Sequence, residues 1–148
     1  MPEIMDIEEQ YDKIFRFCFW KIHNREVAED LTQETFLRYL SSSYREQGKE
    51  MQYLYTIARN LCIDEYRRIG EAEDIENDIS DNGEYSESMD YMVQINAIME
   101  KLSEEDREII VLRFVNEEPI SYICKVTGLS RFALYRRIKT IKKQLSNS

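Results

Sequence analysis

The sequence predicts an all-α protein in two helical parts. An N-terminal three-helix bundle occupies residues 1–69, and a C-terminal helical domain with a helix-turn-helix occupies residues 89–148. A flexible acidic linker over residues 70–88 joins them. Three observations predict this fold class: apolar residues recur at spacings of three and four, the 148 residues include only 4 Gly and 2 Pro, and 43% are hydrophobic. The spacing is typical of amphipathic helices, and the composition favours helical cores over a turn-rich β structure.

Three amphipathic stretches define the N-terminal part. The apolar positions of the first are Ile7, Tyr11, Ile14, Phe15, Cys18, Phe19 and Ile22. The second ends near the serines at 41–43, and its apolar positions are Val27, Ala28, Leu31, Phe36, Leu37 and Leu40. The third runs from about Met51 to Ile69, with apolar positions Leu54, Ile57, Ala58 and Leu61. Three such helices with short loops are expected to form a compact bundle.

The segment from Gly70 to Ser88 is rich in Glu, Asp, Asn and Ser, and its sizeable apolar residues are Ile75, Ile79 and Tyr85. This composition buries too little apolar surface to fold alone, so it predicts a linker. Helical order resumes with an apolar face formed by Met92, Ile95, Ile98 and Met99. Ser103 is predicted to cap a helix over residues 104–115, with Asp106 as a weaker version of the capping-box partner.

A helix-turn-helix is predicted beyond Pro119, a residue that suits the first turn of a helix. The inner face of the first helix carries Ile120, Ile123 and Cys124. Gly128 can adopt the positive φ of the turn, and Ser130 can cap the second helix. The second helix is expected to bury Leu134, Ile138, Ile141 and Leu145. This arrangement would project the N-terminal side chains of the second helix into a DNA major groove.

The net charge of −9 divides into three blocks along the chain. Residues 1–69 carry 10 Lys and Arg against 13 Asp and Glu, residues 70–100 carry 10 acidic residues and no basic one, and residues 101–148 carry 10 basic against 6 acidic residues. From Lys125 onward there are seven basic residues and no acidic one. The helix-turn-helix is therefore the segment best suited to a polyanion, although Lys142 and Lys143 could instead complement the dipole of their helix end.

Several classes of protein are disfavoured. Cys18, Cys62 and Cys124 are far apart and the only histidine is His23, so a disulfide framework and a metal site are both poorly supported. No Gly-rich phosphate loop or nucleophile elbow is present, so the sequence predicts neither an enzyme nor a cofactor. No apolar run is long enough for a membrane span and the acidic N-terminus is unlike a signal peptide, so we expect a cytoplasmic protein without membrane insertion.

Two blocks of motifs resemble those of the extracytoplasmic function (ECF) group of bacterial RNA polymerase sigma factors, in the same order and over nearly the whole chain. The first block comprises AEDLTQETFL at 28–37, YLYTIARNL at 53–61 and IDEYRR at 63–68. The second comprises LSEEDRE at 102–108 and LRF at 112–114, followed by the helix-turn-helix. The resemblance implies a sigma region 2-like domain and a region 4-like domain. It also implies an alternative sigma factor that binds core RNA polymerase and directs promoter recognition, DNA melting and transcription initiation.

The resemblance assigns candidate residues to three surfaces. The surface for core polymerase comprises Asp30, Leu31, Gln33, Glu34 and Leu37. The surface for the promoter −10 element, which the loop at 41–50 precedes, comprises Tyr53, Tyr55, Arg59, Asn60, Arg67 and Arg68. The surface for the −35 element comprises Ser130, Arg131, Tyr135, Arg136, Arg137, Lys139 and Thr140. An anti-sigma factor is a further candidate partner in this family, although no residue here requires one.

The residue types fit these roles, but each has an alternative. Acidic and amide groups beside leucines suit a basic, partly apolar helix of a partner, but they also suit a solvated face. Aromatic rings can hold unstacked bases while arginines follow the backbone, but Tyr53 and Tyr66 could be ordinary bundle residues. The acidic linker could follow the polymerase channels, as the family's connector does, or serve as a solubilising spacer.

The sequence departs from the family pattern at several positions. Tyr53 stands where many members have Trp, and Tyr122 and Cys124 replace the usual Glu and Ala. Tyr135 and Thr140 occupy positions that are often basic, so we expect an unusual −35 preference. The main rival interpretation is a helix-turn-helix regulator that works without polymerase. That protein would need a ligand pocket or a symmetric dimer interface, and the sequence shows no obvious sign of either.

Overall fold

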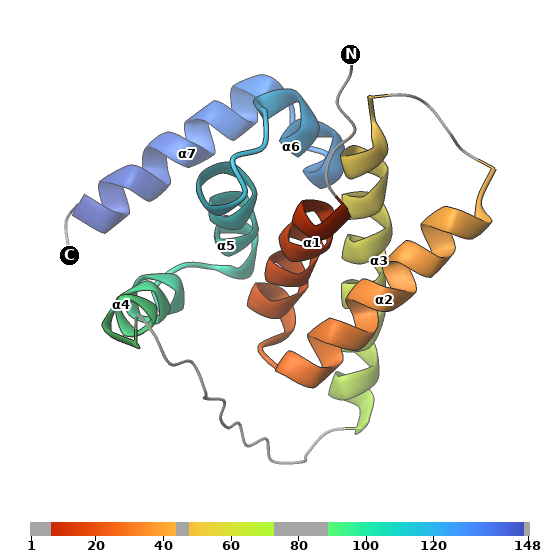
Figure 1. Cartoon of the computed structure of the whole chain (residues 1–148). Helices are drawn as coiled ribbons and strands as arrows, with labels where there is room; N and C mark the ends of the chain where they lie inside the picture. Colours follow the sequence, from red (N-terminus) through yellow and green to blue (C-terminus); the bar gives the residue numbers. More distant parts are fainter. Residues whose placement is uncertain (1–6, 44–47, 73–88, 147–148) are drawn as a thin grey trace. The chain divides into compact units, whose positions relative to one another are not determined.

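The structure, a computed structural model, describes residues 7–43, 48–72 and 89–146, with the backbone alone at 71–72, 89–93 and 95. The chain divides into two compact units, Met1–Glu76 and Asn77–Ser148 (Figure 1). In the part of the chain described, every regular element is a helix, which confirms the predicted all-α class. None of the helices in these ranges is both long and apolar enough to cross a membrane.

The N-terminal unit is a bundle of three helices that each contact the other two (Figure 1). They are α1 (Ile7–Ile22), α2 (Arg25–Ser41) and α3 (Glu50–Ala72). The predicted helices match these bounds within a few residues. Helix α3 extends through residues 70–72, which the sequence placed in the linker, and the rest of the predicted linker lies outside the described residues.

Helices α1 and α3 supply the large apolar side chains of the bundle core. Ile14, Cys18 and Leu54 are fully buried, and the Phe17 ring meets the Tyr55 ring edge-on with 5.4 Å between their centroids. Such an edge-to-face pair is worth about 0.5–1.5 kcal/mol beyond the apolar area that it buries.

Helix α2 buries small and hydroxylated residues and exposes leucines. Ala28, Thr32 and Thr35 are fully buried, whereas Leu37 is 59% and Leu40 is 64% exposed. The Thr32 and Thr35 hydroxyls donate to the backbone carbonyls one turn earlier, each at 2.7 Å, so neither hydroxyl is buried without a hydrogen bond. The apolar spacing therefore predicted the helix but not which face of it is buried.

The C-terminal unit is a helical domain whose last two helices form the predicted helix-turn-helix. Its elements are α4 (Met89–Glu100), α5 (Glu104–Ile110), the π-helical turn η1 (Val111–Val115), α6 (Ile120–Thr127) and α7 (Arg131–Ser146). Both α5 and α6 contact α7. The most deeply buried apolar side chains are Ile109, Val111, Leu112, Ile123, Leu134 and Ile141.

Local hydrogen bonds form the predicted caps and turn. Ser103 Oγ accepts from the Asp106 N–H at 3.1 Å, and Ser130 Oγ accepts from the Ala133 N–H at 3.1 Å. Gly128 has φ +84° and its N–H donates to the Cys124 carbonyl at 2.9 Å. Since few residues other than glycine adopt this φ cheaply, Gly128 sets the turn. Pro119 was predicted in the first turn of this helix, but it lies at the N-cap, immediately before α6 begins.

The helix predicted over residues 104–115 ends in a wider turn than expected. The Asn116 N–H donates to the Val111 carbonyl at 2.8 Å, and the Glu118 N–H donates to the Leu112 carbonyl at 2.8 Å. The first of these hydrogen bonds joins residues five positions apart, which defines a π-type turn. The Arg113 guanidinium donates to the Glu118 carbonyl at 3.0 Å, which ties this turn to the start of α6.

Candidate nucleic-acid interface

The outer face of α7 is basic and lies opposite the buried face of the same helix. The buried face is formed by Leu134, Ile138 and Ile141. At 100° per residue, the opposite side of the helix carries four exposed residues, which we call the α7 outer face: Phe132, Arg136, Lys139 and Lys143. This geometry leaves the three cations available to a polyanion without disturbing the core.

The other predicted residues of this helix-turn-helix lie around that face. Arg131, Tyr135 and Thr140 are exposed on its flanks, and Tyr135 is 51% exposed. Ser130 is exposed at the helix start, where its side chain caps the backbone. The residues predicted for the −35 element did not include Phe132, although an aromatic residue in the first turn of a basic helix could have indicated a role in binding.

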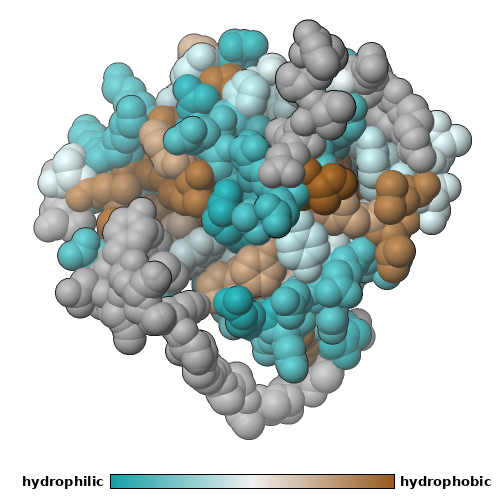
Figure 2. Space-filling view, viewed as in Figure 1, coloured by the Kyte–Doolittle hydropathy of each residue, from teal (hydrophilic) through white to brown (hydrophobic). Residues whose placement is uncertain are grey.

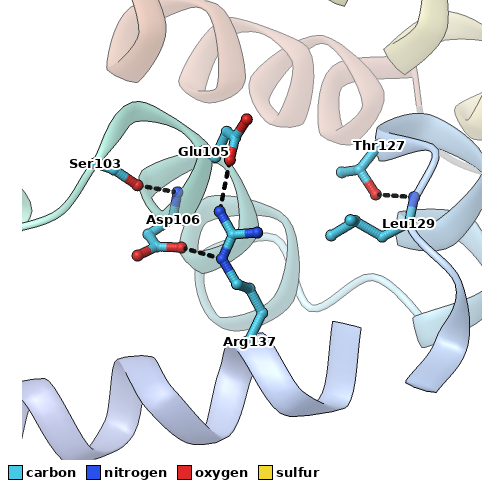
Figure 3. Close-up of polar contacts among 6 residues, drawn as sticks. All are labelled: Ser103, Glu105, Asp106, Thr127, Leu129 and Arg137. Atoms are coloured by element: carbon cyan, nitrogen blue, oxygen red, sulfur yellow. Dashed lines mark hydrogen bonds and ion pairs between the residues drawn. The ribbon is translucent and has the colours of Figure 1, made fainter. Parts of the chain in front are cut away.

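Arg137 points away from the α7 outer face and joins α7 to α5 (Figure 3). Its Nη2 lies 2.6 Å from Glu105 Oε1, and its Nε lies 3.0 Å from Asp106 Oδ1. The hydrogen bond that the guanidinium donates to Glu105 is the largest contribution that raises the pKa of Arg137. Arg137 therefore holds the helix-turn-helix on the preceding helix, and the role predicted for it at the −35 element stays a prediction.

Replacing Arg137 by alanine should lower the stability of the C-terminal unit by about 1 kcal/mol. Arg137 binds two carboxylates and is partly shielded from water. Its contribution to the free energy of unfolding should therefore lie at the upper end of the range for surface ion pairs. Urea unfolding of the full chain, followed in the C-terminal unit by hydrogen exchange, measures the change. Lys139→Ala, which removes a charge on the outer face of the same helix, is the matched control. An equal loss in both variants would contradict the bridging role.

The predicted −10 residues of α3 lie on two sides of the helix. Tyr53, Asn60 and Arg67 follow one another at intervals of seven residues and so share one side. Asn60 and Arg67 are exposed, while half-buried Tyr53 meets the Tyr39 ring of α2 with 5.7 Å between centroids. Tyr55 lies on the opposite side, in the core, with no exposed surface. Thus Tyr55 supports the site through packing, and a base could reach its ring only if the bundle opened.

Two arginines near the end of α3 are exposed and held by acidic neighbours. Arg68 forms two bonds to the Glu65 carboxylate, at 2.7 and 3.3 Å, and the hydrogen bond to Glu65 is the main reason that the pKa of Arg68 is raised. Arg67 Nη1 lies 3.5 Å from Asp64 Oδ1. Arg59 is half-buried on the flank of the same helix. The ion pairs of Arg67 and Arg68 hold their guanidinium groups near the helix surface, where a phosphate could compete with the carboxylates for them.

Helix α2 presents a mixed acidic and apolar surface, which we call the α2 outer face. Its exposed members are Asp30, Gln33, Leu37 and Leu40. They lie on the side away from Thr32 and Thr35, and Figure 2 shows hydrophobic surface among hydrophilic residues along this helix. Of the other predicted residues, Leu31 is half-buried, and Glu34 accepts from Arg38 Nε at 2.9 Å. Leucines that are exposed together can contribute to a docking surface, so the core-polymerase role predicted for this helix stays a prediction.

The C-terminal unit also has an apolar groove that the sequence did not reveal. It encloses about 360 Å³ between α4, the π-helical turn and α7. Its lining comprises Ile98, Met99, Ile110, Phe114, Val115, Ile141, Lys142 and Leu145. Figure 2 shows hydrophobic surface along α7 in this region. Helix α7 thus has a basic side and an apolar side.

Both units match segments of one protein family. Residues 7–71 match Sigma-70 region 2, and residues 92–145 match Sigma-70, region 4. The first match contains the α2 and α3 surfaces, and the second contains the helix-turn-helix. The order of the two segments along the chain is the one that the motif resemblance predicted.

Relatives with similar sequences are bacterial sigma factors. The ECF RNA polymerase sigma factor BldN of Streptomyces coelicolor is 30% identical over 93% of this chain, which spans 58% of that protein's length. RNA polymerase sigma factor YlaC of Bacillus subtilis is 27% identical over 98% of this chain and 93% of its own. The sigma factor RpoE, solved in complex with the anti-sigma factor NepR from Bartonella quintana, has the same fold. It is 20% identical, with a TM-score of 0.74 over 93% of this chain and 90% of that one.

The fold and these matches define the class of protein: a two-unit helical transcription initiation factor of the sigma-70 type. Within this class, the chain belongs to the ECF group of RNA polymerase sigma factors. It is an alternative sigma factor, which directs transcription initiation at specific promoters. Members of this family act as initiation factors rather than as enzymes.

Proposed function

We propose that the two units divide the work of promoter recognition. The N-terminal unit binds core RNA polymerase through the α2 outer face and the promoter −10 element through α3. The C-terminal unit binds the −35 element through α7. The observation that carries this proposal is that each matched sigma region has its own exposed surface of suitable chemistry, formed by residues that its core does not use.

The α2 outer face is proposed to dock on a basic, partly apolar helix of core polymerase. Leu37 and Leu40 would supply apolar contact area, while Asp30 would complement a cation of the partner. The fold buries threonines and an alanine on the other side of this helix, so the leucines are not needed for the bundle core. Two exposed leucines on one side of a helix, not needed for the bundle core, can form the apolar centre of a protein interface.

The α3 surface is proposed to hold the −10 element as the DNA strands separate. Asn60 can hydrogen bond to a base edge, Arg67 can bind a phosphate, and the exposed side of the Tyr53 ring can support an unstacked base. Tyr66, 40% exposed, offers a second aromatic face near the two arginines. Since flipping a base costs a few kcal/mol, a surface that stacks and hydrogen bonds to it favours the open strand.

The α7 outer face and its flanks are proposed to enter the major groove at the −35 element. The predicted residues there are Arg131, Tyr135, Arg136, Lys139 and Thr140. Since bacterial RNA polymerase transcribes the chromosome in the cytoplasm, we place the protein there. An anti-sigma factor is a further proposed partner, by analogy with the complexed relative.

Free protein should bind promoter DNA weakly, and tight binding should appear only with core polymerase. The net charge of −9 opposes approach to DNA, and of the three charge blocks only residues 101–148 carry more basic than acidic residues. Mobility-shift titrations at one salt concentration, with and without core enzyme, measure the difference. A preference of at least about a hundredfold for the holoenzyme is expected, since non-specific binding is weak at physiological salt.

Tight, sequence-specific binding by the isolated chain as a homodimer would contradict the proposal. It would support a regulator that acts without polymerase. Size-exclusion chromatography distinguishes the two, because a sigma factor co-elutes with core enzyme whereas the regulator elutes as a free dimer.

A further inference from the structure

The helix proposed to enter the major groove exposes a phenylalanine. Phe132 is the second residue of α7 and is 73% exposed, more than any other large apolar side chain among the residues described. Single exposed apolar residues are common on proteins and need no function. Phe132 differs because it lies on the α7 outer face, opposite Leu134, so the fold makes no use of its ring.

The Phe132 ring contacts an arginine of the same face. The guanidinium carbon of Arg136 lies 5.0 Å from the ring centroid, one helical turn further along α7. Residues four apart are neighbours on a helix surface, and a cation over an aromatic face is attracted to it. The contact restricts the rotamers of Arg136, and so less side-chain entropy remains to be lost when the guanidinium binds a base.

The two side chains together fit a particular pair of base edges. A guanidinium is the common bidentate partner of guanine O6 and N7 in the major groove. An apolar side chain such as phenylalanine is a partner of the thymine 5-methyl group. Since the two groups touch each other, the bases that they contact should be neighbours.

We propose that Phe132 and Arg136 form one reading element that recognises a thymine beside a guanine in the −35 element, with the Phe132 ring on the thymine methyl and Arg136 on the guanine. The inference rests on the function proposed above and adds the base identity to it. It also extends the predicted −35 set to Phe132, whose side chain can take no part in hydrogen bonding.

Removal of single methyl groups from the promoter tests the proposal. A promoter library transcribed by holoenzyme made from the full chain first identifies the −35 element. Each thymine of that element is then replaced by deoxyuridine, which lacks only the 5-methyl group. At one thymine beside a guanine, the wild-type holoenzyme should lose about fourfold in promoter affinity, the factor that corresponds to one buried methyl-sized group.

The variant Phe132→Ala should bind the thymine and deoxyuridine promoters with the same affinity. Phe132→Leu keeps an apolar side chain and should retain part of the discrimination. Lys139→Ala is the matched control, because it lies on the same face. It should weaken binding to both promoters equally and keep the fourfold ratio. Circular dichroism tests whether each variant is folded, and we expect all of them to be, because the substituted positions are exposed.

Two outcomes would overturn the inference while leaving the proposed function intact. In one, holoenzyme initiates normally but no thymine of the −35 element is sensitive to loss of its methyl group. In the other, Phe132→Ala keeps the discrimination in full. If holoenzyme initiates at no promoter of the library, the proposed function fails and the inference fails with it.

Discussion

Replacing Leu37 and Leu40 by glutamate should weaken binding to core RNA polymerase by about thirtyfold or more, without unfolding the protein. Both side chains are largely exposed, at 59% and 64%, so the bundle core loses nothing. In the complex, however, a charge would replace the proposed apolar contact area. Truncation of a hot-spot residue at the centre of an interface costs at least about 2 kcal/mol, which corresponds to this factor.

Competition binding against a labelled wild-type sigma factor measures this effect. Ile7→Glu is the control, because Ile7 is 65% exposed on a different helix and gains a glutamate charge at a similarly exposed apolar position; the single variants Leu37→Glu and Leu40→Glu match it in charge. The control should bind core enzyme as the wild type does. Equal affinity of the double leucine variant and the wild type would remove the α2 outer face from the polymerase interface.

Replacing Leu134 by alanine should unfold the C-terminal unit and leave the N-terminal unit folded. Leu134 is fully buried in the first turns of α7. Leucine-to-alanine changes at such sites cost about 2–5 kcal/mol. A core of this size supplies only about 3–5 kcal/mol. The variant should therefore lose −35 binding and keep its affinity for core polymerase.

Hydrogen exchange resolved by helix measures the response of each unit. Protection should disappear in α5, α6 and α7 and persist in α1 and α3. Leu145→Ala, at a half-buried position near the end of the same helix, should cause a smaller loss. If α1 and α3 lost protection together with α7, the two units would fold as one, which would contradict their separate roles.

Local sequence signals predicted most of the fold, because caps and turns depend on a few neighbouring residues. Gly128, Ser130 and Ser103 have the predicted roles, since a positive φ or a hydroxyl acceptor acts within one turn of its own position. The π-helical turn after Ile110 was not predicted. It depends on hydrogen bonds from Asn116 and Glu118, which the spacing of apolar residues does not report.

The side on which a residue lies was harder to predict, because it depends on the partner helices. Tyr55 was predicted as a −10 residue, but it has no exposed surface and packs edge-on against the Phe17 ring of another helix. Thr32 and Thr35 read as polar, yet their hydroxyls bond to their own helix and can be buried. Arg137 was predicted as one more DNA-binding basic residue of the recognition helix, but Glu105 and Asp106 of α5 bind its guanidinium. Burial and pairing of this kind become visible only in three dimensions.

The most direct test is transcription in vitro by core RNA polymerase with the purified full chain, on a library of promoter fragments with mapped start sites. We expect new start sites that require the chain and that share two elements upstream, one for each unit. Arg136→Ala should reduce initiation at these sites by about tenfold or more, the cost of one good base contact. Unchanged start sites in the presence of the chain would contradict the account.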